Sequence, residues 1–309
     1  MPASQSTNGK AYEHAVALGF REFVNAAIIE DAASAHARRC FEAITLPQQR
    51  KFVRTAKAAA EIILEQEPWL GDVSRVAIRI QPDKAGVRGD VRDVLLVADD
   101  GRTVGISCKT NHEALKHSRL SGILDFVRSW QIDSAGCSDD YWAAIKPVFN
   151  ELADIRRASD GKAQWESQPN VYARFYLPVL DAWRVELLRA VKQAGKEHQA
   201  CAGLIGYLYG TNDFYKVIGK HGRKVEISVL GINFHGTLST RRSLFPQALL
   251  DVDCKDGGPN TRIARFDRGF SLSFRIHSAS KKVEASLKFD INALSLPPTH
   301  FFQASKQVG

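Results

Sequence analysis

The sequence contains no long run of apolar residues. A helix that spans a membrane needs about 20 of them in succession, and no stretch of the 309 residues approaches that length. The first residues, MPASQSTNGKAYEHAV, also lack the order of a secretory signal, in which basic residues precede an apolar stretch, because Lys10 and Glu13 stand early in them. These absences favour a soluble, cytoplasmic protein with no membrane among its partners.

Cysteine is scarce and irregularly spaced. The chain has 5 cysteines, an odd number, and no two of them form a CXXC pair. This pattern argues against a disulfide framework and against structural zinc, and it suits a reducing compartment. The sequence also shows no internal repeat and no low-complexity tract, so neither a repeat array nor a disordered tail is indicated.

Positive charge, by contrast, is in excess. Lysine and arginine number 42 against 34 acidic residues, which gives a formal net charge of +8 and a pI near 9.2. Such an excess favours a polyanionic partner such as nucleic acid. A basic protein without such a partner would show the same balance, so charge alone leaves both interpretations open.

The hydrophobic pattern divides the chain into helical and strand-rich parts. Apolar residues recur at helical spacing from about residue 11 to 67, and again from 139 to about 195. Between these parts, residues 73–80, VSRVAIRI, alternate apolar with polar residues as a half-buried strand does, and two apolar segments around an Asp-Asp-Gly turn are typical of a hairpin. Further strands are expected beyond Phe214. This order predicts an α/β or α+β fold.

The stretch GISCKTNHEALKHSRLS, residues 105–121, suggests two different chemistries. Its HEALKH segment resembles the zinc-protease motif HEXXH with one residue added. Two histidines four residues apart differ by about 400° around a helix, so that both face one metal. His112 and His117 are five residues apart and differ by about 500°, so a helix cannot bring both rings to one zinc ion. We therefore expect them to be polar residues of a loop or short helix near a ligand.

The ISCK segment instead fits the end of a nuclease motif. Phosphodiester cleavage needs a divalent metal, carboxylates that hold it, and a cation near the attacking water and the phosphate. The PD-(D/E)XK nuclease core places an aspartate at the start of one strand and an acid-X-lysine triplet on the next. Here Asp93 precedes VLLV, and Lys109 ends VGISCK after the Asp-Gly turn. These two residues are the predicted catalytic pair.

The length of the turn decides whether Asp93 and Lys109 meet. A two-residue turn places Asp93 opposite Cys108, and Lys109 then points to the other face of the sheet. A three-residue turn, with Gly101 in the left-handed conformation, places Asp93 opposite Ser107. Lys109 then shares the face of Ser107. Only the second register builds a site, so the sequence predicts the three-residue turn.

Ser107 departs from the nuclease motif, because a neutral hydroxyl stands where a metal-binding carboxylate is expected. Another acid must then help to hold the metal, and the candidates are Asp90, in the segment GDVRD, and Glu13 on the first helix. The backbone carbonyl of Cys108 is a further candidate, because hard cations accept carbonyl oxygen. Asp90 and Asp93 also suit an ordinary turn at the start of a strand, which is the alternative without chemistry.

Longer segments carry a family resemblance. GDVRDVLLV and GISCKTNHEALKHSRLS resemble the HaeIII-type family of type II restriction endonucleases, as do NGKAYEHA, YLYGTNDFYKVIG and FSLSFRIHSASKKVEASLKFDI, so the resemblance covers most of the chain in order. It implies a Mg²⁺-dependent nuclease of a restriction–modification system that cuts double-stranded DNA at the palindrome GGCC. It also implies a cognate cytosine methyltransferase that protects the host.

The same resemblance implies a fold and a domain plan. We expect a PD-(D/E)XK restriction-endonuclease-like core, in which a central mixed β-sheet is flanked by helices and followed by a strand-rich C-terminal portion. The chain would form a single restriction endonuclease domain, residues 1–309. Residues 1–135 would hold the helical start and the catalytic hairpin, and residues 136–309 the part that recognises DNA.

By matching positions, the resemblance implies a catalytic site around Asp93, Ser107 and Lys109, with Asp90 beside them and Glu13 on the opening helix. Water would attack phosphorus in line, and Mg²⁺ would stabilise the charge that builds on the phosphate oxygens. Asp93 would bind the metal. Lys109 would orient the water, help to deprotonate it, or balance charge, and the sequence leaves these roles open. A DNA-binding protein that has lost cleavage is the alternative, motivated by Ser107.

One set of predicted DNA contacts follows the catalytic strand directly. Lys116 and Arg119 suit phosphate or guanine contacts, because lysine and arginine reach guanine O6 and N7 in the major groove. Asn111, His112 and His117 would orient the water or a phosphate. Solvated polar side chains explain the same pattern equally well.

A second set of candidates lies near the C-terminus. Alternation within FRIHSA puts Arg275 and His277 on one face of a strand, and Lys288 is a further candidate for contact with DNA. A palindromic site would suit a homodimer, although a monomer that nicks each strand in turn is equally compatible with the sequence.

Overall fold

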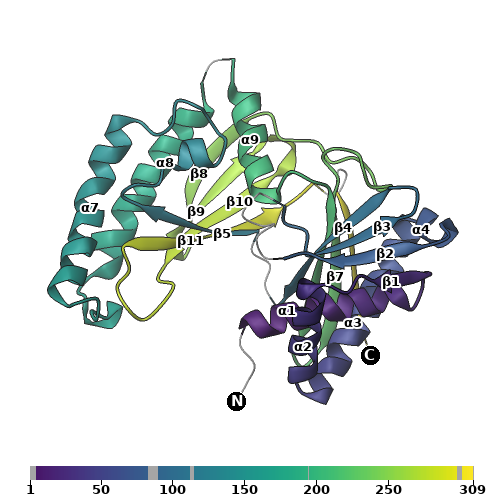
Figure 1. The fold of residues 1–309 in the computed structure, drawn as a ribbon. Coiled ribbons are helices and arrows are strands. Elements are labelled where there is room, and N and C mark those ends of the chain that lie inside the picture. Colours follow the sequence, from purple (N-terminus) through teal and green to yellow (C-terminus); the bar gives the residue numbers. More distant parts are fainter. Residues whose placement is uncertain (1–4, 83–89, 112–114, 194, 298–300, 309) are drawn as a thin grey trace. The chain divides into compact units, whose positions relative to one another are not determined.

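The computed structural model describes residues 5–82, 90–111, 115–193, 195–297 and 301–308, and Figure 1 shows its fold. The chain forms two compact units. The first unit contains Met1–Glu113, Gly210–Leu244 and Pro298–Gly309, and the second contains Ala114–Tyr209 and Phe245–Pro297. The chain therefore passes between the units after residues 113, 209, 244 and 297.

The first unit is built on a mixed sheet of seven strands in the order β1-β2-β3-β4-β6-β7-β12. Neighbouring strands run antiparallel except for β1 with β2 and β4 with β6, which are parallel. The strands are β1 (Ala26–Ile28), β2 (Val76–Ile80), β3 (Val94–Ala98), β4 (Thr103–Thr110), β6 (Phe214–His221), β7 (Val225–Ile232) and β12 (Phe302–Gln307). The helices are α1 (Gln5–Arg21), α2 (Ala32–Ala43), α3 (Leu46–Gln66) and the short α4 (Trp69–Asp72).

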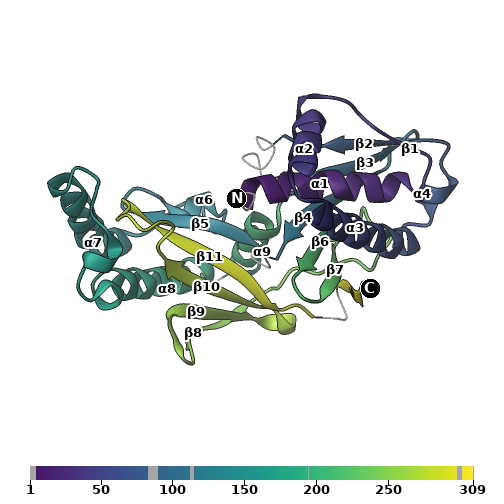
Figure 2. The same cartoon turned by 90° about the horizontal axis from the view of Figure 1, so that it is seen from below.

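Helices cover one face of this sheet. Figure 2 shows α1, α2 and α3 side by side against the strands, and residues such as Tyr12 and Ile106 join in one hydrophobic core. Helices α1 and α3 approach closely at Gly19, where an added Cβ would lie 2.8 Å from the carbonyl carbon of Ala56. The helical pattern of residues 11–67 is confirmed for α1, α2 and α3. It is wrong for Ala26–Ile28, which form strand β1 by pairing with β2.

The second unit contains a sheet of five antiparallel strands in the order β5-β11-β10-β9-β8. The strands are β5 (Lys116–Ser121), β8 (Leu249–Lys255), β9 (Gly258–Phe266), β10 (Ser271–His277) and β11 (Ser286–Ser295). Its helices include α6 (Phe126–Ser129), α7 (Asp139–Ala158), α8 (Leu177–Val191) and α9 (Glu197–Tyr209).

An aromatic core joins the helices of the second unit to one face of its sheet. The ring centroid of Trp183, on α8, lies 4.6 Å from that of Phe274 and 5.1 Å from that of Phe289. Trp130 is fully buried and stacks on Tyr207 at 5.4 Å. These tryptophans therefore pack the core, as aromatic side chains mostly do, and are not base-stacking groups.

Several elements differ from the sequence pattern. Residues 110–121 do not form a loop or short helix throughout, because KHSRLS becomes strand β5 by pairing with β11. Helix α9, EHQACAGLIGYLY, is apolar on most of its sides, so no amphipathic pattern marks it in the sequence. The short strands β8 and β12 lie at sheet edges, where the exposure of alternate residues weakens the hydrophobic signal.

The fold class is confirmed: a large mixed sheet is flanked by helices, and strands dominate the C-terminal part of the chain. Within the described ranges, no helix is long and apolar enough to cross a membrane.

Candidate active site

The β3–β4 hairpin determines which side chains share a face. Val94 pairs with Ile106 and Val97 with Thr103, and the turn between them spans three residues, because the Ala98 N–H donates to the carbonyl of Arg102. Gly101 has a φ of +88°, the left-handed conformation that such a turn requires. By the same register Asp93 stands opposite Ser107. The predicted register is confirmed.

Strand β4 extends beyond the end of its partner. Pairing with β3 stops at Val94, so Ser107 to Thr110 continue without a β3 neighbour. The N–H of Cys108 is therefore available to the Asp93 side chain, and it donates to Oδ2 at 2.6 Å. The N–H and C=O of one strand residue point toward the same neighbouring strand, so the carbonyl of Cys108 also faces Asp93.

Three donors converge on the carboxylate of Asp93. Besides the Cys108 N–H, Oδ2 accepts a hydrogen bond from Ser107 Oγ at 3.3 Å and from Lys109 Nζ at 3.4 Å. The side chains of Lys109 and Asp93 keep 35% and 24% of their surface exposed. The structure thus brings the three predicted catalytic residues together at a position that solvent reaches.

Glu13 joins this site from α1. It is buried, and its Oε2 lies 2.9 Å from Nζ of Lys10. Burial, and next the negative charge of Asp93, raise the pKa of Glu13 to about 7, while the positive charges of Lys10 and Lys109 oppose the shift. Among the described residues, Glu13 is thus an acid on which the charge of Asp93 acts. Lys10 was not predicted, although its place one helical turn before Glu13 is visible in the sequence.

Asp90 occupies a different position. Its Oδ1 accepts from Nε of Arg92 at 2.7 Å, and its Oδ2 from Nη2 of Arg92 at 2.7 Å and from Nε2 of Gln81 at 3.0 Å. Burial raises the pKa of Asp90, but the hydrogen bonds from Arg92 and Gln81 outweigh it, so the net shift is downward. The Arg92 side chain lies over Gly105, where an added Cβ would meet its Cδ. Both carboxylate oxygens of Asp90 are thus engaged by Arg92 and Gln81.

Asn111 links the ends of two parallel strands. Its N–H donates to the carbonyl of Gly219 at 3.0 Å, and its Oδ1 accepts from the N–H of His221 at 3.0 Å. Its φ of +58° is one that asparagine adopts more readily than most residues. The His221 ring packs among Tyr12 and Phe52, and burial, then the charge of Lys51, lowers the pKa of His221 to about 4. His112 lies outside the described residues.

The remaining predicted DNA contacts lie on the sheet of the second unit. Arg119 pairs with Lys288 across β5 and β11, and Lys288 pairs with His277 across β11 and β10. Arg275 stands opposite Asp290. Side chains of paired residues point to the same face, so this face carries a group of basic residues. Lys116 and His117 belong to β5, but their side chains are outside what the structure describes.

Ion pairs occupy part of this basic face. Arg119 lies 3.0 Å from Glu284, His277 lies 2.5 Å from Oδ2 of Asp290, and Lys288 lies 3.4 Å from Oδ1 of Asp290. Arg275 is exposed and, among the described residues, forms no ion pair. It is therefore the most available cation of the four candidates.

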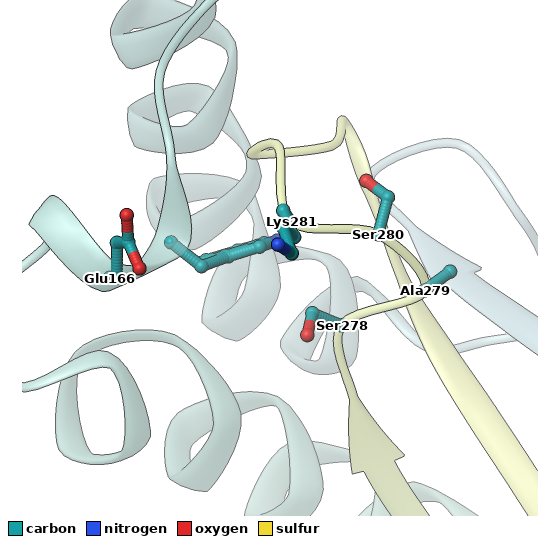
Figure 3. Close-up of a pocket in the computed structure, with 6 residues that line it drawn as sticks. Glu166, Ser278, Ala279, Ser280 and Lys281 are labelled. Carbon is teal, nitrogen blue, oxygen red and sulfur yellow. The ribbon is translucent and has the colours of Figure 1, made fainter.

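A separate hollow in the second unit has a volume of about 450 Å³. Figure 3 shows Glu166 on one side of it and Ser278 to Lys281 on the other. None of the predicted catalytic residues lines it. Asp93 and Lys109 instead lie at the open end of the β3–β4 hairpin, where their side chains are partly exposed. A double helix could approach such an exposed position more easily than an enclosed pocket.

The donor set around Asp93 fits a hard divalent cation. Carboxylate, carbonyl and hydroxyl oxygens are available from Asp93, Glu13, Cys108 and Ser107, and hard cations prefer oxygen ligands. In the described parts of the chain, no three His, Cys, Asp or Glu side chains come together to hold a metal. A cation here would therefore rely on two carboxylates, backbone oxygen and water.

A mixed sheet flanked by helices, with an aspartate before one strand and a lysine near the end of the next, is consistent with a nuclease of the restriction-endonuclease class. The model of the HaeIII restriction endonuclease family matches residues 9–297. The chain is also 32% identical over 319 residues to the type II restriction enzyme HaeIII of Haemophilus aegyptius, an alignment that covers 97% of each chain. No solved structure matches the chain. The chain belongs to the HaeIII restriction endonuclease family and is a site-specific deoxyribonuclease.

Proposed function

We propose that this protein is a Mg²⁺-dependent type II restriction endonuclease that hydrolyses double-stranded DNA at GGCC. One observation carries the proposal: the carboxylate of Asp93 contacts both Ser107 and Lys109 while its charge acts on Glu13. The proposed recognition sequence GGCC rests on the resemblance to the HaeIII family. The similar protein of Haemophilus aegyptius is named type II restriction enzyme HaeIII.

The residues have distinct proposed roles. Asp93, Glu13 and the carbonyl of Cys108 would hold Mg²⁺, which when bound supplies positive charge to the phosphate oxygens. Ser107 holds Asp93 in place through its hydroxyl. Lys109, whose Nζ reaches Asp93, orients the attacking water in line with the bond that breaks and balances the charge that builds on the phosphate.

The serine at position 107 follows from this arrangement. A carboxylate there would stand directly beside Asp93, and two such charges repel unless a cation lies between them. Glu13 supplies the second carboxylate from the helix, and its pKa is raised first by burial and next by the negative charge of Asp93. Asp90, held by Arg92, is a less suitable ligand.

DNA recognition is assigned to the second unit. We propose that Arg275, Arg119, Lys288 and His277 contact the duplex, so that both units serve one restriction endonuclease domain. The host sequence would be protected by a cytosine methyltransferase of the same restriction–modification system. The enzyme would act in the cytoplasm, either as a homodimer or as a monomer that nicks each strand in turn.

A second candidate function is sequence-specific DNA binding without cleavage. Ser107 favours it, because the usual acid before the lysine is missing. Both functions share the fold and the basic face, so only a reaction separates them.

A digest with mapped ends tests the proposal. Purified protein is incubated with Mg²⁺ and two duplexes that differ only in the presence of GGCC, and the termini of the products are sequenced. Cuts confined to the GGCC duplex are expected. Binding to that duplex without cutting would favour the second candidate, and cutting of both duplexes would remove the sequence specificity.

A further inference from the structure

Lys216 lies beside the candidate active site on a neighbouring strand. In the parallel pairing of β4 with β6, Lys216 is the partner of Ser107, and paired residues place their side chains on the same face. Asp93 stands opposite Ser107 on the β3 side of β4. Asp93, Ser107 and Lys216 therefore follow one another across three neighbouring chain segments, on one face of the sheet. Neighbouring strands are about 4.8 Å apart, well within the reach of a lysine side chain.

The burial of Lys216 is unusual for a lysine. Only 5% of its surface is exposed, whereas lysine is almost never buried unless its charge is used or paired. Its neighbours Tyr215 and Val217 belong to the hydrophobic core on the other face, so the side chain of Lys216 lies on the same face of the sheet as Ser107.

The charges around Ser107 suit a phosphate. Among the residues that the structure describes, Asp93 and Glu13 supply carboxylates, while Lys10, Lys109 and Lys216 supply ammonium groups at or next to the same site. Ser107 is neutral and adds no negative charge beside Lys216. With serine at position 107, the charge next to the scissile phosphate is therefore more positive than it would be with an acid at that position.

We propose that Lys216 is a second active-site lysine, whose ammonium group acts with that of Lys109 on the negative charge of the scissile phosphate. This inference rests on the proposed nuclease site at Asp93. It assigns part of the charge stabilisation to Lys216, which follows Lys109 by 107 residues in the sequence. Lys216 lies on β6, the first strand after residues 114–209 of the second unit.

The test uses the full-length enzyme and three variants, Lys216→Met, Lys216→Arg and Lys224→Met. Methionine keeps the length of the side chain and removes the charge, and Lys224 is an exposed lysine just before β7. Single-turnover cleavage of a GGCC duplex is measured with Mg²⁺, together with DNA binding in EDTA and the melting temperature.

Lys216→Met is expected to lower the single-turnover rate about 100-fold, the usual effect of removing one group that stabilises transition-state charge, without a lower melting temperature. Lys216→Arg should recover part of the rate, and Lys224→Met should leave it unchanged. A wild-type rate per folded molecule in Lys216→Met overturns the inference, and so does a loss of activity that only follows a loss of folding.

An Asp93→Asn variant separates this inference from the proposed function. If Asp93→Asn is inactive while Lys216→Met cleaves normally, only the role of Lys216 is refuted. If both variants cleave normally, the nuclease site itself has been misplaced.

Discussion

The two sheets use polar residues in opposite ways. Each has one face packed against helices and polar side chains on the other. In the seven-stranded sheet, Ser107, Cys108 and Lys109 all direct a donor at one oxygen of Asp93. In the five-stranded sheet, Arg119 pairs with Glu284 and Lys288 with Asp290, so the charges are spread over several strands. A reaction needs convergence on one point, whereas contact with a long polyanion needs distribution along a surface.

Unequal strand lengths allow this convergence in the first sheet. β3 has five residues and β4 has eight, so the end of β4 presents backbone N–H groups that β3 does not use, and the Asp93 side chain accepts from one of them. In the second sheet, β11 also extends beyond β5, which pairs with residues 286–291 of the ten residues in β11. Unequal length is therefore common to both sheets, and the site depends on the aspartate that stands beside the free end of β4.

The strongest test of this difference between the sheets is to neutralise one aspartate beside or within each of them. Asp93→Asn should lower the single-turnover cleavage rate by a factor of about 1,000 or more, because the convergent carboxylate is lost. Asp290→Asn is the matched change and should alter the rate less than about tenfold, since its loss releases cations rather than removing a ligand. Equal effects of the two changes would show that Asp93 has no special role.

The covered face of the first sheet should show its own pH dependence. The lowered pKa of His221, about 4 against an ordinary value of 6.5, means that the folded state binds fewer protons than the unfolded chain between these values. His221 therefore contributes stability that is present above pH 6.5 and is lost as the pH falls through 4. The loss should reach about 2 to 3 kcal/mol of unfolding free energy.

Denaturant unfolding of the metal-free protein between pH 4 and 7 measures this effect. A His221→Gln variant keeps a hydrogen-bonding group for Thr55, whose Oγ1 lies 3.0 Å from Nε2 of the ring, but does not titrate. The variant should lose less stability than the wild type on acidification. The same pH profile in both proteins would assign the dependence to other groups.

The smallest effects are expected on the basic face of the second sheet. Arg275→Ala should weaken DNA binding in EDTA by up to about tenfold and reduce the slope of log affinity against log salt by about 0.9, the value for one phosphate contact on duplex DNA. Lys288→Ala should do less, because Asp290 already neutralises part of its charge. Binding measured by fluorescence anisotropy at several salt concentrations gives both numbers. If neither variant changes the slope of log affinity against log salt, the proposal that this face contacts DNA is wrong.

Much of the site could be predicted because it is local in the chain. Asp93 and Lys109 are joined by a short hairpin, and turn chemistry around Gly101 was enough to choose the register that the structure has. Glu13 appeared among the candidates as an acid on the first helix. The family resemblance, carried by the hairpin and several other segments, then agreed with the comparison over most of the chain.

The parts that escaped prediction depend on distant segments. KHSRLS has one leucine among polar residues, so nothing local marks it as a strand, and only β11, more than 160 residues later, makes it one. Lys216 is similarly hidden in FYKVIGKH, where it looks like any strand lysine. Asp90 looked like a ligand from its spacing to Asp93, but Arg92 and Gln81 engage its oxygens in the folded chain.

The sequence by itself determined the register of the β3–β4 hairpin, because the conformations allowed to an Asp-Asp-Gly turn set the pairing of the residues on both sides of it. Only the tertiary structure decided what stands around that hairpin: Glu13 from the helix, Lys216 from β6, and the partners of Asp90. The parallel pairing of β4 with β6 is closed by a connection that contains residues 114–209 of the second unit. Parallel strands need a crossover connection of about a dozen or more residues. The path of this connection depends on packing between residues that are far apart in the sequence.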